Sequence, residues 1–196
     1  MDKITARKEY LALRSSMSEE LRMNESDRIS ARVMDFLKDR EFEGILSYAS
    51  YKSEVDSWKF NLEILKAGYK LYLPRTTLKD IQFYGIDNVS TDSAFRRKLV
   101  KNKLGIMEPM PDTVKKFKPK AGKKYIAFVP GVAFDKDMHR MGYGKAYYDR
   151  FFSDMEDKSN IIKVGICYCM CLFPEIPYDN NDISMDYVLT GDKLYE

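Results

Sequence analysis

A glycine-rich segment in the C-terminal half carries residue types that can hold a phosphate group. Gly142 and Gly144 flank Tyr143, Lys145 follows directly, and a helix is expected to start near Tyr143 and to run through Phe152. Glycines let backbone N–H groups approach an anion closely, and a helix N-terminus adds about half a positive charge. The segment therefore predicts a phosphate cradle, and the alternative is an ordinary glycine-rich turn with a solvated lysine.

The standard nucleotide-binding loops do not describe this segment. A Walker A loop would need glycine in place of His139 and Ser or Thr in place of Ala146. A dinucleotide fingerprint would need a third glycine in place of Tyr147. Any phosphate site here must therefore follow another pattern.

Three cations of the first expected helix form a second candidate anion site. Lys3, Arg7 and Arg14 fall within about 40° of one another on a helix of 3.6 residues per turn. Like charges in one stripe repel each other unless an anion lies along them. The stripe is therefore either a solvated face or part of an anion site.

Several acids could bind a ligand or a cation. Glu54 follows an expected strand, at the end of a sheet where ligands of open α/β folds collect. Asp149, Asp182 and Asp186 offer the oxygen ligands that magnesium takes together with substrate phosphates. The spacing alone selects none of them from the 30 acids of the chain.

The elements that must position these residues alternate between helices and strands. Ser26 is expected to cap the second helix, and Pro74 is expected to end the second strand. Apolar runs that are continuous rather than alternating indicate an α/β sheet covered on both faces. The expected helices are 3–17, 27–39, 57–66 and 143–152, and the expected strands are 44–49, 69–73, 81–86, 125–129, 161–169 and 187–189.

Composition limits the classes of protein to which the chain can belong. With 196 residues, 44% hydrophobic and 32% charged, the chain is expected to fold as a single domain over residues 1–196. No apolar run reaches the roughly 18 residues of a membrane span, and the charged N-terminus fits no secretory signal, so we expect a cytoplasmic protein. A net charge of +3 permits an anionic ligand without indicating nucleic acid. Because His139 is the only histidine of the sequence, we do not expect histidine-based catalysis or a histidine-rich metal site.

Six motifs of one known family follow one another in order along nearly the whole chain. The most specific block combines the segment 129–135 with the segment 140–150. The other matching segments are Lys3 to Ser18, Tyr48 to Asp56, Leu73-Pro74-Arg75, Gly105 to Pro109, and Glu175 to Leu189. Through these motifs the chain resembles the 5-formyltetrahydrofolate cyclo-ligase family.

This resemblance implies a fold, a reaction and a set of site residues. The fold would be a three-layer α/β/α sandwich around a mostly parallel sheet, and the enzyme would close 5-formyltetrahydrofolate to 5,10-methenyltetrahydrofolate with ATP and Mg²⁺, releasing ADP and phosphate. Lys145, Arg140 and Tyr148 would be catalytic. The ATP site would hold Lys3, Arg7, Arg14, Arg140, Gly142, Tyr143, Gly144, Lys145, Ala146, Tyr147, Tyr148 and Asp149. The folate site would hold Ala49, Glu54, Lys145, Tyr147 and Tyr148, and magnesium would bind Asp149 and Asp186.

Two positions depart from the family pattern. Ala146 stands where the family often has glycine, and Cys171 stands where it often has glutamine. The first bears on how closely the turn approaches a phosphate, and the second on a ligand contact at that position.

The expected chemistry suits a chain with one histidine. Phosphorylation of the formyl oxygen by ATP turns a poor leaving group into a good one, after which N10 attacks the carbon and phosphate departs. Such a reaction needs positioning and charge stabilisation rather than a protein nucleophile. Glu54 would orient the pterin through its amino-pyrimidine edge.

Other interpretations remain open at the level of sequence. A sugar-phosphate isomerase or CoA-transferase on a similar fold would use Glu54 or Glu108 as a base or nucleophile and would not need ATP. A nucleic-acid-binding protein would use the basic stretches, although no aromatic RNA-binding signature is present. We expect a monomer whose partner is a small folate, with or without a polyglutamate tail that the basic stretch 115–124 could attract.

Overall fold

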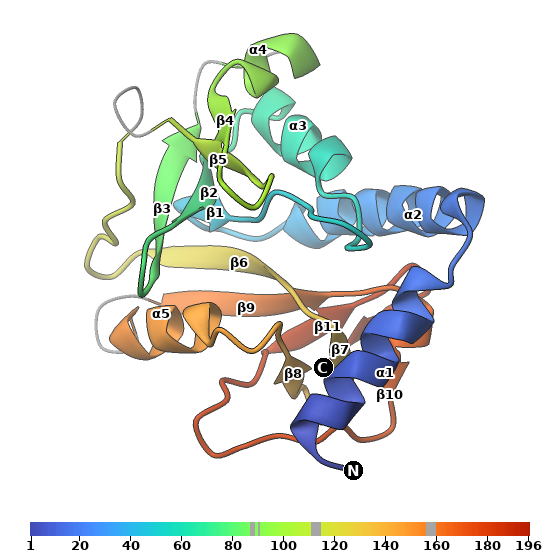
Figure 1. Ribbon diagram of the computed structural model, residues 1–196. Helices are drawn as coiled ribbons and strands as arrows, with labels where there is room; N and C mark the ends of the chain where they lie inside the picture. The colour runs from blue at the N-terminus through green and yellow to red at the C-terminus, as the bar shows by residue number, and fades with distance from the viewer. Residues whose placement is uncertain (87–88, 90, 111–114, 156–159) are drawn as a thin grey trace.

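A twisted sheet forms the centre of the computed structural model, which describes residues 1–86, 89, 91–110, 115–155 and 160–196 (Figure 1). Within those residues, seven strands follow the order β12-β11-β9-β6-β1-β2-β3. They are β1 (Gly44–Leu46), β2 (Leu71–Thr76), β3 (Ile81–Ile86), β6 (Lys124–Pro130), β9 (Asn160–Ile166), β11 (Tyr187–Leu189) and β12 (Leu194–Tyr195). The pairs β2–β1, β1–β6, β6–β9 and β9–β11 are parallel, and the two outer pairs are antiparallel.

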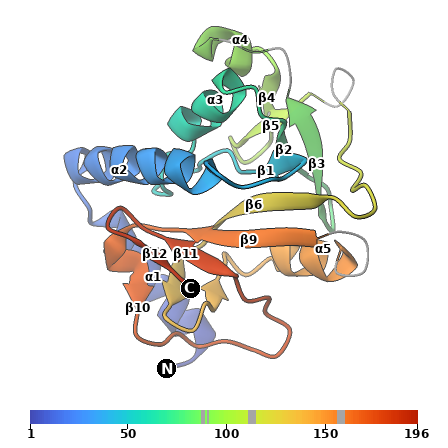
Figure 2. The same ribbon diagram turned by 180° about the vertical axis from the view of Figure 1, so that it is seen from behind.

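Helices cover both faces of this sheet. Figures 1 and 2 show α2 (Glu19–Leu37) and α3 (Trp58–Lys66) on one side and α5 (Tyr147–Met155) on the other. Phe128 of β6 contacts Phe60 of α3 with ring centroids 5.8 Å apart, while Phe83 of β3 contacts Phe151 of α5 at 4.7 Å. The expected three-layer α/β/α sandwich around a mostly parallel sheet is therefore confirmed.

A small second sheet lies beneath the first helix, α1 (Lys3–Ser15). Its strands are β7 (Ala133–Asp135), β8 (Arg140–Met141) and β10 (Leu172–Phe173), in the order β10-β7-β8. Ala6 of α1 is fully buried in a cluster with Ala133, Met141 and Ile176. Helix α1 thus presents its buried side to the segments that carry the most specific sequence motif.

The remaining elements extend the edge of the main sheet near β2. They are α4 (Asp92–Arg96), β4 (Leu99–Lys101) and β5 (Met107–Pro109), and β4 and β5 form a two-stranded antiparallel sheet. No helix in the described part of the chain combines the length and the apolar composition needed to cross a membrane.

The second helix begins earlier than its apolar periodicity indicates. We expected it from residue 27 with Ser26 as the cap, but it starts at Glu19, and the Ser18 hydroxyl caps it by accepting the Leu21 N–H at 3.2 Å. Ser26 is instead buried inside the helix, where its hydroxyl accepts the Asp56 N–H. The first two turns are mostly polar, so a search for apolar spacing missed them.

Pro74 does not end its strand, contrary to expectation. Strand β2 continues to Thr76, with Pro74 opposite Phe83 of β3. The neighbour on the other side, β1, pairs only with Leu71 and Tyr72. On the side that faces away from β3, no strand pairs with β2 at Pro74. The missing N–H of the proline therefore interrupts no hydrogen-bond ladder there.

The ends of β1 and β9 and the start of α5 also differ from the sequence-based expectation. Strand β1 ends at Leu46 rather than residue 49, and β9 ends at Ile166 because Cys169–Cys171 form a 3₁₀ turn. Helix α5 starts at Tyr147 rather than near residue 143. Residues 142–146 are consequently a loop, so any phosphate cradle there is made by loop backbone rather than by a first helical turn.

Close packing of the two sheets depends on a glycine without a side chain. A Cβ atom at Gly165 of β9 would lie 2.4 Å from the Phe134 ring of β7. We expect Gly165→Ala to lower the free energy of unfolding by about 1–3 kcal/mol, the usual cost of overpacking a core. Urea denaturation measures this, with Gly191→Ala as the control because the nearest atoms to its Cβ are 3.7 Å away. Equal unfolding midpoints for the two variants would contradict the packing argument.

Candidate active site

A pocket opens where three neighbouring parallel strands end. Its lining comes from the segments that follow β1, β6 and β9, together with Arg14 of α1. The carboxyl ends of parallel strands share one edge of the sheet, which is where α/β folds bind ligands. The lining residues are Arg14, Tyr48, Glu54, Val55, Pro130, Gly131, Ile166, Cys167, Tyr168 and Cys171.

Arg14 joins the walls of this pocket. Its side chain is 2% exposed, and its guanidinium donates to the Gly131 carbonyl at 2.8 Å and to the Ser53 hydroxyl at 3.1 Å. It also donates a short hydrogen bond to the Tyr143 hydroxyl. One residue thereby connects α1 to the end of β6, to the loop that carries Glu54 and to the glycine-rich loop.

Glu54 lies in this pocket in an environment that disfavours its charge. Burial raises the pKa of Glu54 to about 7, although the Tyr51 N–H at 2.8 Å, the charge of Arg14 and the Tyr143 hydroxyl all favour the carboxylate. Burial and the Glu54 charge in turn raise the pKa of Tyr143 to about 12. A carboxyl group with a pKa near neutrality in a pocket is typical of a functional site.

The glycine-rich loop turns through two left-handed residues. Gly144 has φ +90°, and Ala146 has φ +49°, a conformation that L-residues other than Asn or Asp rarely adopt. The guanidinium of Arg7 donates to the Gly142 carbonyl at 2.8 Å and so holds the loop against α1. The left-handed backbone explains why glycine is the residue that would suit position 146 best.

Lys145 extends from this loop into solvent. Its ammonium group has no hydrogen-bonding or ion-pairing partner among the described residues, whereas its carbonyl accepts a hydrogen bond from Arg150 at 2.9 Å. Tyr147 and Tyr148 follow it in the first turn of α5. Burial and the Glu54 charge raise the pKa of Tyr148, which keeps its hydroxyl protonated near neutral pH.

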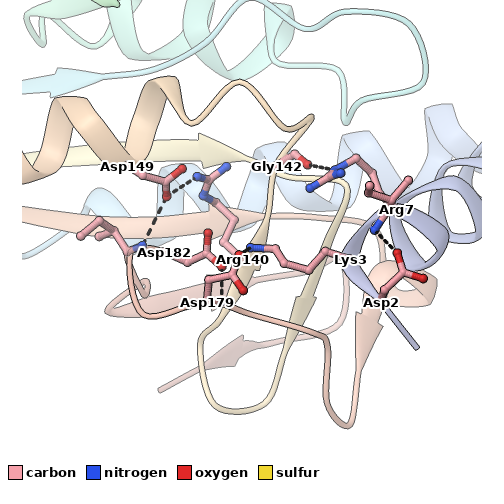
Figure 3. A network of polar contacts seen from close by, with 10 residues as sticks. Asp2, Lys3, Arg7, Arg140, Gly142, Asp149, Asp179 and Asp182 are labelled. Carbon is pink, nitrogen blue, oxygen red and sulfur yellow. Dashed lines mark hydrogen bonds and ion pairs between the residues drawn. The ribbon is translucent and has the colours of Figure 1, made fainter.

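Arg140 and Asp149 form an ion pair beside the loop (Figure 3). The guanidinium is 5% exposed and the carboxylate 13%, with Nη2 and Oδ1 2.8 Å apart. The Nε atom of Arg140 is buried without a hydrogen-bond partner among the described residues. A buried cationic group with an unused donor fits an anionic ligand better than it fits a closed core.

Lys3 is paired with acids of the C-terminal loop. Its ammonium group lies 2.9 Å from Asp179 and also contacts Asp182 (Figure 3). The same loop donates the Ile183 N–H to Asp149 at 3.3 Å. The loop 179–183 therefore connects the N-terminus of α1 with the first turn of α5.

The two acids expected to bind magnesium have different partners. Asp149 contacts Arg140 and the Ile183 N–H, whereas Asp186 accepts from the Lys163 N–H at 2.6 Å and pairs with its ammonium group. Across the ranges that the structure describes, no group of three or more His, Cys, Asp or Glu side chains is arranged to hold a metal. Magnesium at nucleotide sites needs only one or two carboxylates besides phosphates and water.

The structure brings most of the expected site residues together. Those it assembles around the glycine-rich loop and the pocket are Lys3, Arg7, Arg14, Glu54, Arg140, Gly142, Tyr143, Gly144, Lys145, Ala146, Tyr147, Tyr148 and Asp149. Ala49 is buried three residues beyond β1. Asp186 lies at the start of β11, against Lys163 of β9.

Sequence reasoning missed several contributors. Ser53, Gly131 and Tyr168 hold Arg14 and the Glu54 loop, the last through a hydrogen bond from its hydroxyl to the Glu54 carbonyl at 3.0 Å. No spacing signal could have indicated them, because each contact joins distant segments. Asp182 carried a signal as an oxygen ligand beside a turn, but its contact with Lys3 could not be inferred from it.

The arrangement can hold a polyanion on one side and a planar polar group on the other. Lys3, Arg7, Arg140 and Lys145 supply cationic groups around loop backbone, and Arg14 separates them from the pocket of Glu54. A carboxylate can accept two parallel N–H donors from a planar ligand edge. The geometry thus suits an anionic ligand on the loop and a ligand with paired N–H donors in the pocket.

Comparison with known proteins identifies relatives over the whole chain. The sequence model of the 5-formyltetrahydrofolate cyclo-ligase family matches residues 1–191. The 5-formyltetrahydrofolate cyclo-ligase of Mus musculus is 26% identical over 180 residues, which is 90% of this chain and 87% of that one. A probable 5-formyltetrahydrofolate cyclo-ligase of Schizosaccharomyces pombe is 38% identical over 102 residues, 47% of this chain and 50% of that one.

A solved structure has the same fold. The 5,10-methenyltetrahydrofolate synthetase of Aquifex aeolicus superposes with a TM-score of 0.80 at 29% identity, covering 100% of this chain and 92% of that one. The likeness thus includes the loops that carry the candidate site as well as the central sheet.

The left-handed backbone at Ala146 leads to a stability prediction. We expect Ala146→Gly to raise the free energy of unfolding by up to about 1 kcal/mol, because glycine adopts a positive φ without steric cost. Ala67→Gly is the matched control, since Ala67 has φ −74° and gains nothing from glycine. Thermal and urea unfolding would measure both variants. If both lose the same stability, position 146 is not strained.

Proposed function

The chain belongs to the 5-formyltetrahydrofolate cyclo-ligase family, and we propose from that premise that it closes 5-formyltetrahydrofolate to 5,10-methenyltetrahydrofolate with ATP, releasing ADP and phosphate. One observation carries the proposal at the level of geometry. Arg14 lies between a cationic loop suited to a triphosphate and a carboxylate pocket suited to a pterin. ATP and the folate would therefore bind on either side of the Arg14 guanidinium.

The triphosphate would bind on the glycine-rich loop. Lys145 is exposed and unpaired among the described residues, and Arg140 has a buried donor without a partner. Arg7 fixes the loop from α1 through the Gly142 carbonyl. Lys3 would join them by exchanging its carboxylate partners for phosphate oxygens. Tyr143, Gly144, Ala146, Tyr147, Tyr148 and Asp149 would complete this site.

The folate would enter the pocket next to Arg14. The Glu54 carboxylate would accept two N–H bonds from the amino-pyrimidine edge of the pterin, in the ionised form that such acceptance requires. Ala49 would line the strand end beside it. The half-buried rings of Tyr147 and Tyr148 and the Lys145 side chain would face the reacting formyl group.

The residues would act mainly by positioning and by neutralising charge. The reaction transfers the γ-phosphoryl group to the formyl oxygen, N10 attacks the formyl carbon, and the C–O bond breaks as phosphate leaves. Lys145 and Arg140 would stabilise the negative charge on the transferred group, and loop N–H groups would hold it in line. The Tyr148 hydroxyl, protonated near neutral pH, would donate a hydrogen bond to the phosphate oxygen that gains negative charge as the C–O bond breaks.

Asp149 and Asp186 are the residues proposed to hold magnesium. When bound there, Mg²⁺ would supply Lewis-acid stabilisation of the negative charge on the phosphates. Asp149 would need to be shared with Arg140, whose guanidinium lies 2.8 Å away. The small number of carboxylates suits a magnesium ion that keeps water and phosphate ligands.

The wider biological setting is part of the same proposal. We expect a monomer acting in the cytoplasm on a small folate. A polyglutamate tail would run along the basic stretch 115–124, where Lys120 is already paired with Glu43 at 2.8 Å. Hydrogen bonds from Lys120 and Lys70 lower the pKa of Glu43 to about 2. Because Lys120 is already paired, the other lysines of the stretch would carry the attraction.

Removal of the exposed lysine tests the phosphate side of the site. We expect Lys145→Ala to lower turnover roughly 10- to 150-fold, the equivalent of one charge-assisted hydrogen bond. The absorbance of the methenyl product in the near ultraviolet measures the rate. Lys66→Ala is the matched control, because Lys66 is an exposed lysine at the end of α3. Unchanged turnover in Lys145→Ala would remove the lysine from the mechanism.

The pKa of Glu54 predicts a pH dependence on the folate side. Because the carboxylate must be ionised to accept the pterin, the KM for folate should fall roughly tenfold between pH 6 and pH 8. The KM for ATP should change much less. Glu54→Gln should raise the KM for folate and remove its slope with pH.

The titration of Glu54 should also change the free energy of unfolding, but in the opposite direction. A rise in pH that improves folate binding should lower the stability of the fold. The folded protein keeps a proton on Glu54 up to about pH 7, whereas the unfolded chain releases it near pH 4.5. The free energy of unfolding should therefore fall as pH rises through this interval, and Glu54→Gln should flatten that decline. A variant that retains the wild-type slopes in both KM and stability would show that another group titrates.

A further inference from the structure

The residues proposed to bind ATP contact its phosphates and leave its nucleoside without a binding surface. The proposed contacts are all to phosphates, and no residue yet accounts for the purine base. A flat aromatic pair lies next to those phosphate contacts. His139 precedes Arg140 in the chain, and Tyr178 precedes Asp179, whose carboxylate is paired with Lys3.

The two rings form a parallel stack. The centroids of His139 and Tyr178 are 3.7 Å apart, and the ring planes differ by 9°. Tyr178 remains 50% exposed, so the stack covers one part of the ring and leaves the rest open. The buried rings of Phe60 and Phe128 instead meet edge to face, with their centroids 5.8 Å apart.

A buried carboxylate holds both halves of the stack. Asp135 is completely inaccessible to solvent, and its Oδ2 atom lies 3.0 Å from Nδ1 of His139. The same oxygen accepts the Ile176 N–H at 3.1 Å, two residues before Tyr178. The other oxygen accepts the His139 N–H at 2.9 Å. Asp135 therefore fixes the ring of His139 and the backbone that leads to Tyr178.

The loop is also held on the far side of Tyr178. Lys3 pairs with Asp179 and Asp182, and Asp182 accepts the Asp179 N–H at 2.7 Å (Figure 3). An exposed tyrosine ring is thus anchored before and after its own position. The same loop donates the Ile183 N–H to Asp149 at 3.3 Å, and Asp149 pairs with Arg140, which places the loop beside the proposed phosphate contacts.

We infer that Tyr178, supported by His139 and Asp135, is the platform on which the purine base of ATP stacks. Stacking on an aromatic ring uses the face of the base, and a ring that is already fixed loses little conformational freedom on binding. The inference rests on the proposed function, because it assumes that the neighbouring cations hold the triphosphate.

A comparison of two ligands separates the base from the phosphates. The probes are magnesium ATP and magnesium tripolyphosphate, which has the phosphate chain without nucleoside, and isothermal titration calorimetry gives both dissociation constants. We expect Tyr178→Ala to weaken ATP binding roughly 5- to 150-fold, the contribution of one stacked base. Binding of tripolyphosphate should be unchanged. Tyr178→Phe, which keeps the ring, is the matched control and should bind ATP like the wild type.

Other results of these titrations would contradict either the inference or the proposed function. Equal losses for ATP and tripolyphosphate would overturn the inference, because Tyr178 would then act only by positioning the loop that Lys3 contacts. Unchanged ATP binding in Tyr178→Ala would also overturn it. If Tyr178→Ala is unstable, Tyr178→Leu replaces it, since leucine keeps an apolar contact with His139 but offers no ring. A folded wild type that binds neither probe would refute the proposed function itself.

Discussion

The candidate site depends on one buried guanidinium. Arg14 is almost inaccessible to solvent and makes hydrogen bonds to a strand-end carbonyl, a serine hydroxyl and a tyrosine hydroxyl. A buried charge costs stability unless its donors are satisfied, so these three partners are held in place together with Arg14. The nearby Glu54 carboxylate is its electrostatic counterpart, yet burial still keeps the pKa of that acid near neutrality. Arg14 therefore fixes where the glycine-rich loop ends and where the pocket of Glu54 begins.

Features that arise from local chemistry could be predicted from the sequence. The continuous apolar run of β6 and the turn residues around β3 indicated strands at the right positions, because such signals need only neighbouring residues. The start of α2 was missed because its first turns bury little apolar surface, and β2 runs past Pro74 because β1 stops pairing with it first. Strands of two or three residues such as β8 are too short to show any period.

The candidate site also has features that the local sequence predicts and contacts that it could not predict. Helical spacing placed Lys3, Arg7 and Arg14 on one stripe; Arg7 and Arg14 both reach the glycine-rich loop, whereas Lys3 reaches the loop 179–183. Spacing could not reveal these partners, because all of them lie in other segments of the chain and most are more than a hundred residues away. Nor could it show that position 146 adopts a left-handed backbone, which depends on how the loop joins α5.

The contacts of α1 also set the order in which the molecule can be completed during synthesis. The hydrogen bond from Arg14 to Gly131 can form only after a further 117 residues have been synthesised, and the contact of Lys3 with Asp182 only after a further 179. A nascent chain emerges N-terminus first, so this helix leaves the ribosome before any surface exists to receive it. Its docking closes the longest loops of the fold and must come late. A ribosome-bound chain can therefore contain much of its sheet and still have no active site.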